Sequence, residues 1–341
     1  MKRSRVLAVY LAAAMAAAAI SGCGGSGKGA PGAEDAAVTE AMQENVLGAA
    51  SGESPEAGGS SEAGGSSEAG ESSEAGESSG VGESSETGES SQANGDKAGG
   101  NVRAPKEYKG NVPNPPAEDG SRILFVGNSH TYTNDLPGVF LELAEAGGHT
   151  VDVYDLTEGS YTLERYADPE DELGAVLAGA LSEEPWDFVV LQENTNAAIS
   201  VNAKKDMYPY ARQLDEMIRS AGGQTVFLMT WSPKEGAGAI SRDMVQSMLS
   251  TGYRTIADEL GALLIPGGDV FADALKTDDT LELWGEDGQH PSVEGTYLAA
   301  CTAYCLFFQE TPVGNPYTGE LEENAAEKLQ EIAWSYMQGQ S

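Results

Sequence analysis

Five short runs of apolar residues recur between residues 123 and 265, and most are separated by segments whose apolar side chains follow a helical spacing. Short apolar runs bounded by glycine or polar residues are typical of buried parallel strands. Strands that alternate with helices predict a parallel sheet with helices on both faces. We therefore expect one α/β domain built on a five-stranded parallel sheet. The predicted strands are residues 123–126, 150–156, 188–191, 225–229 and 263–265.

The same pattern indicates where a functional site would lie. In open parallel sheets, ligands bind beyond the carboxyl ends of the strands. Ser129, Gly159 and the segment 192–196 each follow a predicted strand, so we expect them at one edge of the sheet. The predicted helices are residues 136–146, 207–218, 245–260, 293–308 and 321–337.

The chain upstream of this pattern has a different composition. Residues 24–118 consist mainly of Gly, Ser, Glu and Ala, and a Ser-Ser-Glu-Ala-Gly theme repeats between residues 60 and 91. Such a segment buries too little apolar surface to offset the entropy of ordering the chain. We predict a flexible, disordered tether over residues 23–118 and a globular domain over residues 119–341.

The first residues are typical of a secretory signal. Lys2, Arg3 and Arg5 precede an apolar stretch over residues 6–20, which is short for a membrane-spanning helix. The small residues before Cys23 resemble the lipobox of bacterial lipoproteins. That resemblance implies a signal peptide over residues 1–22, a lipid on Cys23, and an extracytoplasmic protein anchored to the bacterial membrane at the cell surface.

Composition narrows the set of partners. The formal net charge of −35 argues against nucleic acid or anionic lipid as a direct partner. Cys301 and Cys305 are expected to pack as small apolar residues on one helix face. The sequence has neither a His/Cys cluster nor a Gly-x-x-x-x-Gly-Lys loop, so we expect no metal and no cofactor.

Two distant motifs carry candidate chemistry. Ser129 leaves the first predicted strand, and Asp287 stands three residues before His290 on a later loop. A serine, a histidine and a carboxylate supply a nucleophile, a general base and the group that orients the base. The other histidines suit this role less well, because His130 is the neighbour of Ser129 and His149 is expected at the surface of the opposite edge.

Acyl transfer also needs hydrogen-bond donors for the oxyanion that develops in the transition state. The N–H group of Ser129 is one candidate, and Gly159 is a second because glycine permits a close backbone approach. A side-chain amide is the expected third donor. Gln192, Asn194 and Asn196 all follow the third predicted strand and remain alternatives.

These motifs together resemble the SGNH (GDSL-type) hydrolases, over roughly residues 122–310. Gly127-Asn128-Ser129-His130 is similar to the first family block, Gly159 to the second, Asn194-Thr195-Asn196-Ala197 to the third, and Asp287-x-x-His290 to the last. The third block departs from the family at Asn194 and Ala197. The resemblance implies a flavodoxin-like three-layer α/β/α sandwich. It further implies catalysis by Ser129, His290 and Asp287, oxyanion donors at Ser129, Gly159 and Asn196, and no cofactor.

We therefore expect a surface-anchored serine esterase, monomeric, that hydrolyses O-acyl esters, above all O-acetyl esters, on a carbohydrate, a cell-wall polymer or a small ester. An O-acyltransferase that uses the same three residues is one alternative. A glycan-binding lipoprotein with weak or no catalysis is another, which the altered third block favours. A purely structural surface protein would leave the serine, histidine and aspartate motifs without a role.

Overall fold

The computed structural model describes residues 5–6 and 116–339 of the chain. The predicted lipidation at Cys23 and nearly all of the signal and tether lie outside the described residues and stay predictions. Two residues of the predicted signal are described, and they form the short strand β1 (Arg5–Val6). Ala117 is buried and its N–H donates to the carbonyl of Phe307 at 3.0 Å, so the packed region already includes residues before 119.

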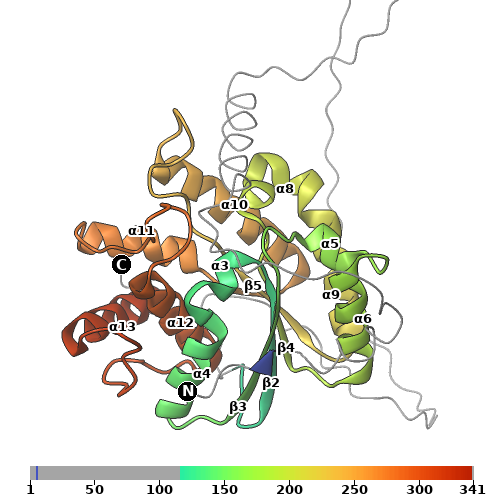
Figure 1. The fold of residues 1–341 in the computed structure, drawn as a ribbon, viewed down its shortest axis with the longest axis horizontal. Helices are drawn as coiled ribbons and strands as arrows, with labels where there is room; N and C mark the ends of the chain where they lie inside the picture. Colours follow the sequence, from blue (N-terminus) through green and yellow to red (C-terminus); the bar gives the residue numbers. More distant parts are fainter. Residues whose placement is uncertain (1–4, 7–115, 340–341) are drawn as a thin grey trace, which may run out of the picture. The chain divides into compact units, whose positions relative to one another are not determined.

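The sheet contains the five predicted strands, all parallel, with β1 added at one edge (Figure 1). The order is β1-β3-β2-β4-β5-β6, so β2 lies between the strands that follow it in the chain. Among the five predicted strands this is the order of the flavodoxin-like fold. The strands are β2 (Ser121–Gly127), β3 (Val151–Thr157), β4 (Phe188–Leu191), β5 (Gln224–Leu228) and β6 (Leu263–Ile265).

Side chains on the two faces of β2 enter two separate cores. Ile123 and Phe125 face one core, and Leu124 and Val126 face the other, as the two-residue period of a strand requires. Helices cover both faces, which confirms the predicted three-layer α/β/α sandwich (Figure 1). The first core contains α4 (Leu136–Ala146), α11 (Gly267–Thr277), α12 (Val293–Phe308) and α13 (Glu323–Met337). The second contains α5 (Leu163–Ala167), α6 (Glu172–Glu183), α8 (Ser200–Asp206), α9 (Tyr208–Ser220) and α10 (Arg242–Leu260).

Capping residues in the sequence fix both ends of α10 and the start of α12. Ser241 caps α10 by accepting a hydrogen bond from the N–H of Met244, and Gly261 ends that helix at φ 59°. Ser292 caps α12 in the same way, through the N–H of Gly295 at 3.0 Å. The N-cap that fixes the start of α12 therefore stands two residues after His290.

The structure also tests what the sequence predicted for two cysteines and one histidine. Cys301 and Cys305 are buried in α12 as free thiols, which confirms that they pack as small apolar residues. The surface position expected for His149 is met only in part. Its side chain is only 21% exposed, because the ring stacks on Phe308 at 3.8 Å between centroids. Within the described part of the chain, no helix is long and apolar enough to cross a membrane.

Candidate active site

The structure brings together the serine, histidine and aspartate that the sequence singled out. Nε2 of His290 lies 2.7 Å from Oγ of Ser129, and Nδ1 lies 2.5 Å from Oδ2 of Asp287. Ser129 opens the short helix α3 (Ser129–Tyr132), and the other two residues belong to the loop before α12. A proton on Nδ1 donated to Asp287 leaves Nε2 free to accept from the hydroxyl of Ser129. This geometry suits a serine nucleophile with its base.

Asp287 is held as a carboxylate. Burial raises the pKa of its carboxyl group, but hydrogen bonds from the His290 ring and from the N–H groups of Gln289 and His290 outweigh that effect. The pKa of Asp287 therefore lies below its usual value, and the group stays negatively charged at neutral pH. A fixed negative charge at Nδ1 orients the imidazole and stabilises its protonated form.

Ser129 is positioned by a buried amide from the neighbouring strand. Oε1 of Gln192 accepts from the N–H of Asn128 and from the hydroxyl of Thr131, both at 2.8 Å. Its Nε2 donates to Oδ1 of Asn128 at 3.0 Å. Gly127 leaves room for this amide, because a Cβ there would lie 2.6 Å from Gln192 Oε1. The residue after β4 thus fixes the turn that presents Ser129.

The His290 loop is held by residues 231–234, which follow β5 and which we call the clamp segment. Nε1 of Trp231 donates to the carbonyl of Gln289 at 3.0 Å, and the N–H of Lys234 donates to the carbonyl of Gly288 at 2.8 Å. In return, Nε1 of Trp284 donates to the carbonyl of Ser232 at 3.0 Å. These three bonds fix the chain just before Asp287 and between Asp287 and His290.

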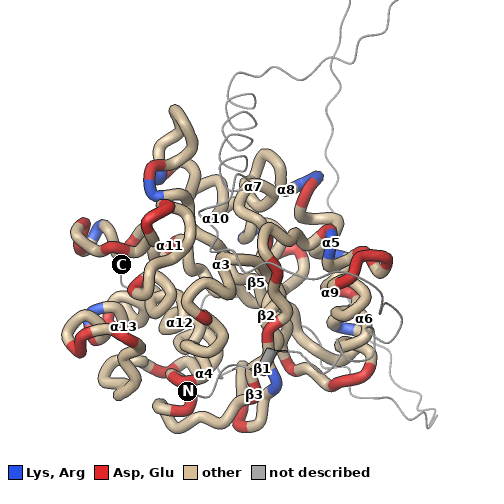
Figure 2. The backbone as a smooth tube through the Cα atoms, viewed as in Figure 1, with Lys and Arg blue, Asp and Glu red and all other residues tan. Residues whose placement is uncertain are grey.

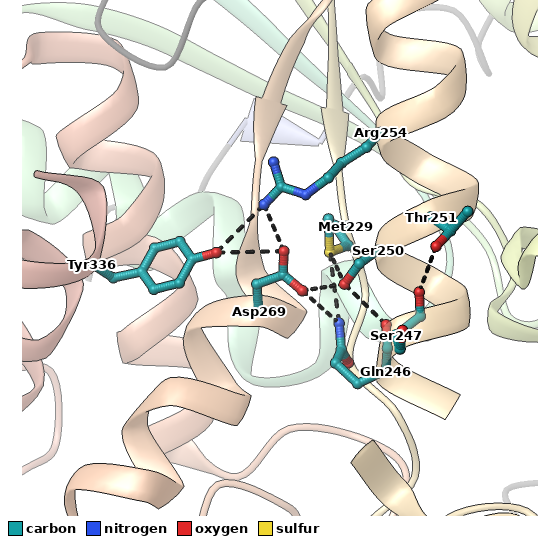
Figure 3. A network of polar contacts seen from close by, with 8 residues as sticks. All are labelled: Met229, Gln246, Ser247, Ser250, Thr251, Arg254, Asp269 and Tyr336. Carbon is teal, nitrogen blue, oxygen red and sulfur yellow. Dashed lines mark hydrogen bonds and ion pairs between the residues drawn. The ribbon is translucent and has the colours of Figure 1, made fainter. Parts of the chain in front are cut away.

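A polar network, drawn in Figure 3, is joined to the clamp segment through Gln246. Gln246 of α10 accepts from the N–H of Ser232 at 2.9 Å and donates to Asp269 of α11 at 3.3 Å. Asp269 also pairs with Arg254 at 2.6 Å and accepts from the hydroxyl of Tyr336 in α13 at 3.4 Å. No sequence motif indicates this network, because its members come from three helices.

A second link joins the nucleophile side to the His290 loop. Nδ2 of Asn134, in the 3-10 helix η2 (Thr133–Asp135), donates to the carbonyl of Pro291 at 2.9 Å and to Thr296 at 3.1 Å. Asn134 and Asp135 both have φ 56°, a left-handed conformation that Asn and Asp tolerate better than most residues. The contacts of Asn134 hold this turn in place despite its strain.

The predicted oxyanion donors differ in how available they are. The N–H of Gly159 is taken up by Glu158 Oε1 at 2.9 Å. Gln192 is committed to the nucleophile turn, and its Nε2 also donates to the carbonyl of Glu193 at 2.7 Å. Asn194 and Asn196 each use their Oδ1 as an acceptor, whereas neither Nδ2 donates to another described residue.

Strand register favours Asn194 over Asn196. Val126 of β2 pairs with Leu191 of β4, so Ser129 and Asn194 stand equally far beyond paired residues. Asn194 caps α7 (Thr195–Ala198), whereas Asn196 lies inside that helix. The geometry thus leaves the Ser129 N–H and the Asn194 amide as the better-placed pair.

Two further titratable groups surround the site. The ring of His130 lies 5.2 Å from that of His290 and 5.7 Å from that of Trp231. Burial, together with the charge of His290, lowers the pKa of His130 to about 3, so this imidazole stays neutral. It lines the site without competing for the proton of Ser129.

Glu193 lies fully buried between the backbone N–H groups of Asn194 and Leu163. Its carboxyl accepts from the N–H of Asn194 at 2.5 Å and from the N–H of Leu163 at 3.1 Å. Burial raises the pKa of Glu193 to about 8. The side chain ties the segment after β4 to the start of α5. Across residues 5–6 and 116–339, no cluster of three or more His, Cys, Asp or Glu could hold a metal ion.

Comparison with known proteins places these features in context. No family model and no curated protein matches the chain. Among solved structures, "a putative SGNH hydrolase" from Slackia heliotrinireducens is 30% identical, with 55% of this chain and 99% of that chain covered and a TM-score of 0.47. A DUF4886 family protein from Bacteroides uniformis is 19% identical over 65% and 97% of the two chains, with a TM-score of 0.54, and shares the fold. Axe2, an acetylxylan esterase from Geobacillus stearothermophilus, is 16% identical over 56% and 95%, with a TM-score of 0.42.

Proposed function

The chain belongs to the SGNH hydrolase family, and we propose that it is a serine esterase in which Ser129, His290 and Asp287 carry out acyl transfer. The single observation that supports this most strongly is the unbroken path from Ser129 Oγ through His290 to Asp287, with contacts of 2.7 and 2.5 Å. A binding protein without catalysis would have no need of this alignment. Proton transfer requires contacts of this length.

The reaction follows from that path. Oγ of Ser129 attacks the ester carbonyl carbon while Nε2 of His290 takes the hydroxyl proton. The tetrahedral intermediate collapses, the C–O bond to the alcohol breaks, and His290 gives its proton to the leaving alcohol. Water then attacks the acyl-serine with His290 again as base, and the acid and free Ser129 are released. Asp287 stabilises the imidazolium that forms in both halves.

The oxyanion is stabilised by the N–H of Ser129 and the side-chain amide of Asn194. Each such donor contributes about 10²–10³ in rate. Gly159 joins them only if Glu158 releases its N–H, since that carboxylate holds it at 2.9 Å. Asn196, which the family resemblance implied, remains the alternative to Asn194.

We propose O-acetyl groups on a carbohydrate or cell-wall polymer as the substrate. The ring of His130 contacts those of both His290 and Trp231, at 5.2 and 5.7 Å between centroids. This crowding beside the base supports a short acyl group over a long chain. The predicted tether and the lipid on Cys23 would hold the enzyme at the cell surface, where such polymers lie. Loss of palmitate labelling in Cys23→Ser, with unchanged labelling in Cys301→Ser, tests the anchor.

The substrate test is a panel of p-nitrophenyl esters from acetate upward, beside acetylated xylan and acetylated peptidoglycan. We expect acetate to be released from at least one polymer and turnover to fall with acyl length. Ser129→Ala should abolish both activities. A wild-type enzyme that releases no acid, or a Ser129→Ala variant of unchanged activity, would contradict the proposal. Acetyl groups recovered on an added sugar instead of as free acetate would identify a transferase.

A further inference from the structure

A cleft outside the three catalytic residues lies along the side of the first core. Its volume is about 540 Å³, within the usual range for a small-molecule site. It runs between η2 and the first turns of α4 on one side and the start of α12 and the loop around residues 317–320 on the other. None of Ser129, His290 or Asp287 lines it.

The cleft adjoins the catalytic loop. Asn134 lines the cleft, and its Nδ2 also donates to the carbonyl of Pro291, the residue after His290. Val293, at the start of α12, forms part of the same wall and is 37% exposed. The wall of the cleft is therefore hydrogen-bonded to the residue that follows the catalytic histidine.

The lining has a distinct chemistry. It includes the carboxylates of Asp135, Glu142 and Glu320 and no Lys, Arg or His. The phenol of Tyr317 stands among these groups: burial raises its pKa, and the charges of Glu142, Asp135 and Glu320 raise it further. The backbone of Tyr317 is fixed by a hydrogen bond from Tyr297 to its carbonyl at 2.6 Å. Acidic residues also outnumber basic ones along the rest of the described chain (Figure 2).

We infer that this cleft binds an amino-bearing sugar unit of a polysaccharide whose esterified unit lies at Ser129. The carboxylates attract a protonated amine and repel a uronic acid or a phosphate. The Tyr317 ring supplies a face for a cation or a sugar ring, and Val139 and Val293 supply apolar contact. The placement of the ester rests on the proposed function, whereas the binding of the amino sugar does not.

The test is calorimetric titration of the full-length protein at low salt with three oligomers of equal length. They are the hexamer of glucosamine, which is cationic, the hexamer of N-acetylglucosamine, which is neutral, and hexagalacturonate, which is anionic. We expect the glucosamine hexamer to bind most tightly and to lose affinity as salt rises. The double variant Glu142→Gln/Glu320→Gln should weaken this binding about tenfold or more.

The matched control is Glu183→Gln/Glu216→Gln, which removes two carboxylates from a separate cleft between α6 and α9. It should bind the glucosamine hexamer like the wild type. Equal binding of the neutral hexamer, no binding of the cationic one, or equal losses in both double variants would overturn the inference. Hydrolysis of p-nitrophenyl acetate by the wild type is measured in parallel. If the wild type binds the glucosamine hexamer through these carboxylates but hydrolyses no ester, the missing hydrolysis refutes the proposed esterase. The cleft assignment then still stands.

Discussion

Nε2 of His290 lies 2.7 Å from Oγ of Ser129, although 161 positions separate the two residues. Two independent supports produce this contact. Gln192 fixes the turn that carries Ser129, and the clamp segment fixes the loop that carries His290. The following variants test each support separately from the catalytic residues themselves.

Trp231→Phe should slow the enzyme more than it destabilises it. Phenylalanine keeps the stacking on Phe271, at 4.3 Å between centroids, but loses the hydrogen bond to the carbonyl of Gln289. A loop displaced by about 1 Å costs up to about 10² in rate, so we expect kcat to fall about 10- to 100-fold.

The control for that variant is Trp186→Phe, which loses an equivalent buried bond to the carbonyl of Ala180, away from the site. Both variants should lose about 1 kcal/mol of unfolding free energy. Thermal unfolding and p-nitrophenyl acetate kinetics on the same samples separate the effects. Equal kcat values in the two variants would refute a positioning role for Trp231.

Gln192→Leu should reduce both stability and activity. The change leaves the N–H of Asn128 and the hydroxyl of Thr131 without their buried acceptor. Each unsatisfied group costs about 1–3 kcal/mol, so urea unfolding should show a loss of about 2–6 kcal/mol. Gln330→Leu, at another buried glutamine that accepts from Gly314, should lose similar stability with kcat on p-nitrophenyl acetate unchanged. If both variants keep wild-type kcat, Gln192 does not position the nucleophile.

Asn194→Ala should lower kcat about 10²–10³-fold, with a smaller change in KM, because the lost amide acts on the transition state. Asn196→Ala removes the side-chain acceptor of Asn202 but keeps the carbonyl that Asn202 also donates to, and should cost stability more than rate. Single-turnover kinetics on both variants decide between the two amides. A larger loss of rate in Asn196→Ala would restore the assignment that the family resemblance implied.

Glu193→Gln should become more stable relative to the wild type as pH rises. Burial raises the pKa of Glu193 from 4.5 to about 8, so the folded protein binds this proton more tightly than the unfolded chain. The wild type loses stability relative to the variant between pH 4.5 and pH 8, by up to about 1.4 kcal/mol per pH unit. Urea unfolding of both proteins from pH 4 to pH 9 measures the difference. A difference that is constant with pH would show that the carboxyl is not perturbed.

The five strands were predictable because each is a short apolar run in the sequence. The segments between most of them have apolar residues at helical spacing, which separates one strand from the next. The helix α11 is not among the predicted helices, because Pro266-Gly267-Gly268 at its start is typical of a turn. The structure gives another reason for the second glycine: a Cβ on Gly268 would lie 2.1 Å from the carbonyl oxygen of Thr230. For α6, the four-residue spacing of the buried Leu177 and Leu181 is itself a helical signal.

The serine, histidine and aspartate were predictable as a set, because each follows a recognisable break in the pattern. The third oxyanion donor was not predictable, because an amide's availability depends on long-range partners. The amide of Gln192 is already hydrogen-bonded to Asn128, which is 64 positions away in the sequence. The role of the clamp segment was likewise not predictable from the sequence, since Trp231 and Gln289 come into contact only in the folded chain.

The most direct test of the account is the site and rate of labelling by a fluorophosphonate. Mass spectrometry of the wild type should find one adduct, on Ser129, and none in Ser129→Ala. In His290→Ala the same adduct should form at least about 10³-fold more slowly, because the base is lost. An adduct on another residue, or labelling of His290→Ala at the wild-type rate, would contradict the central claim.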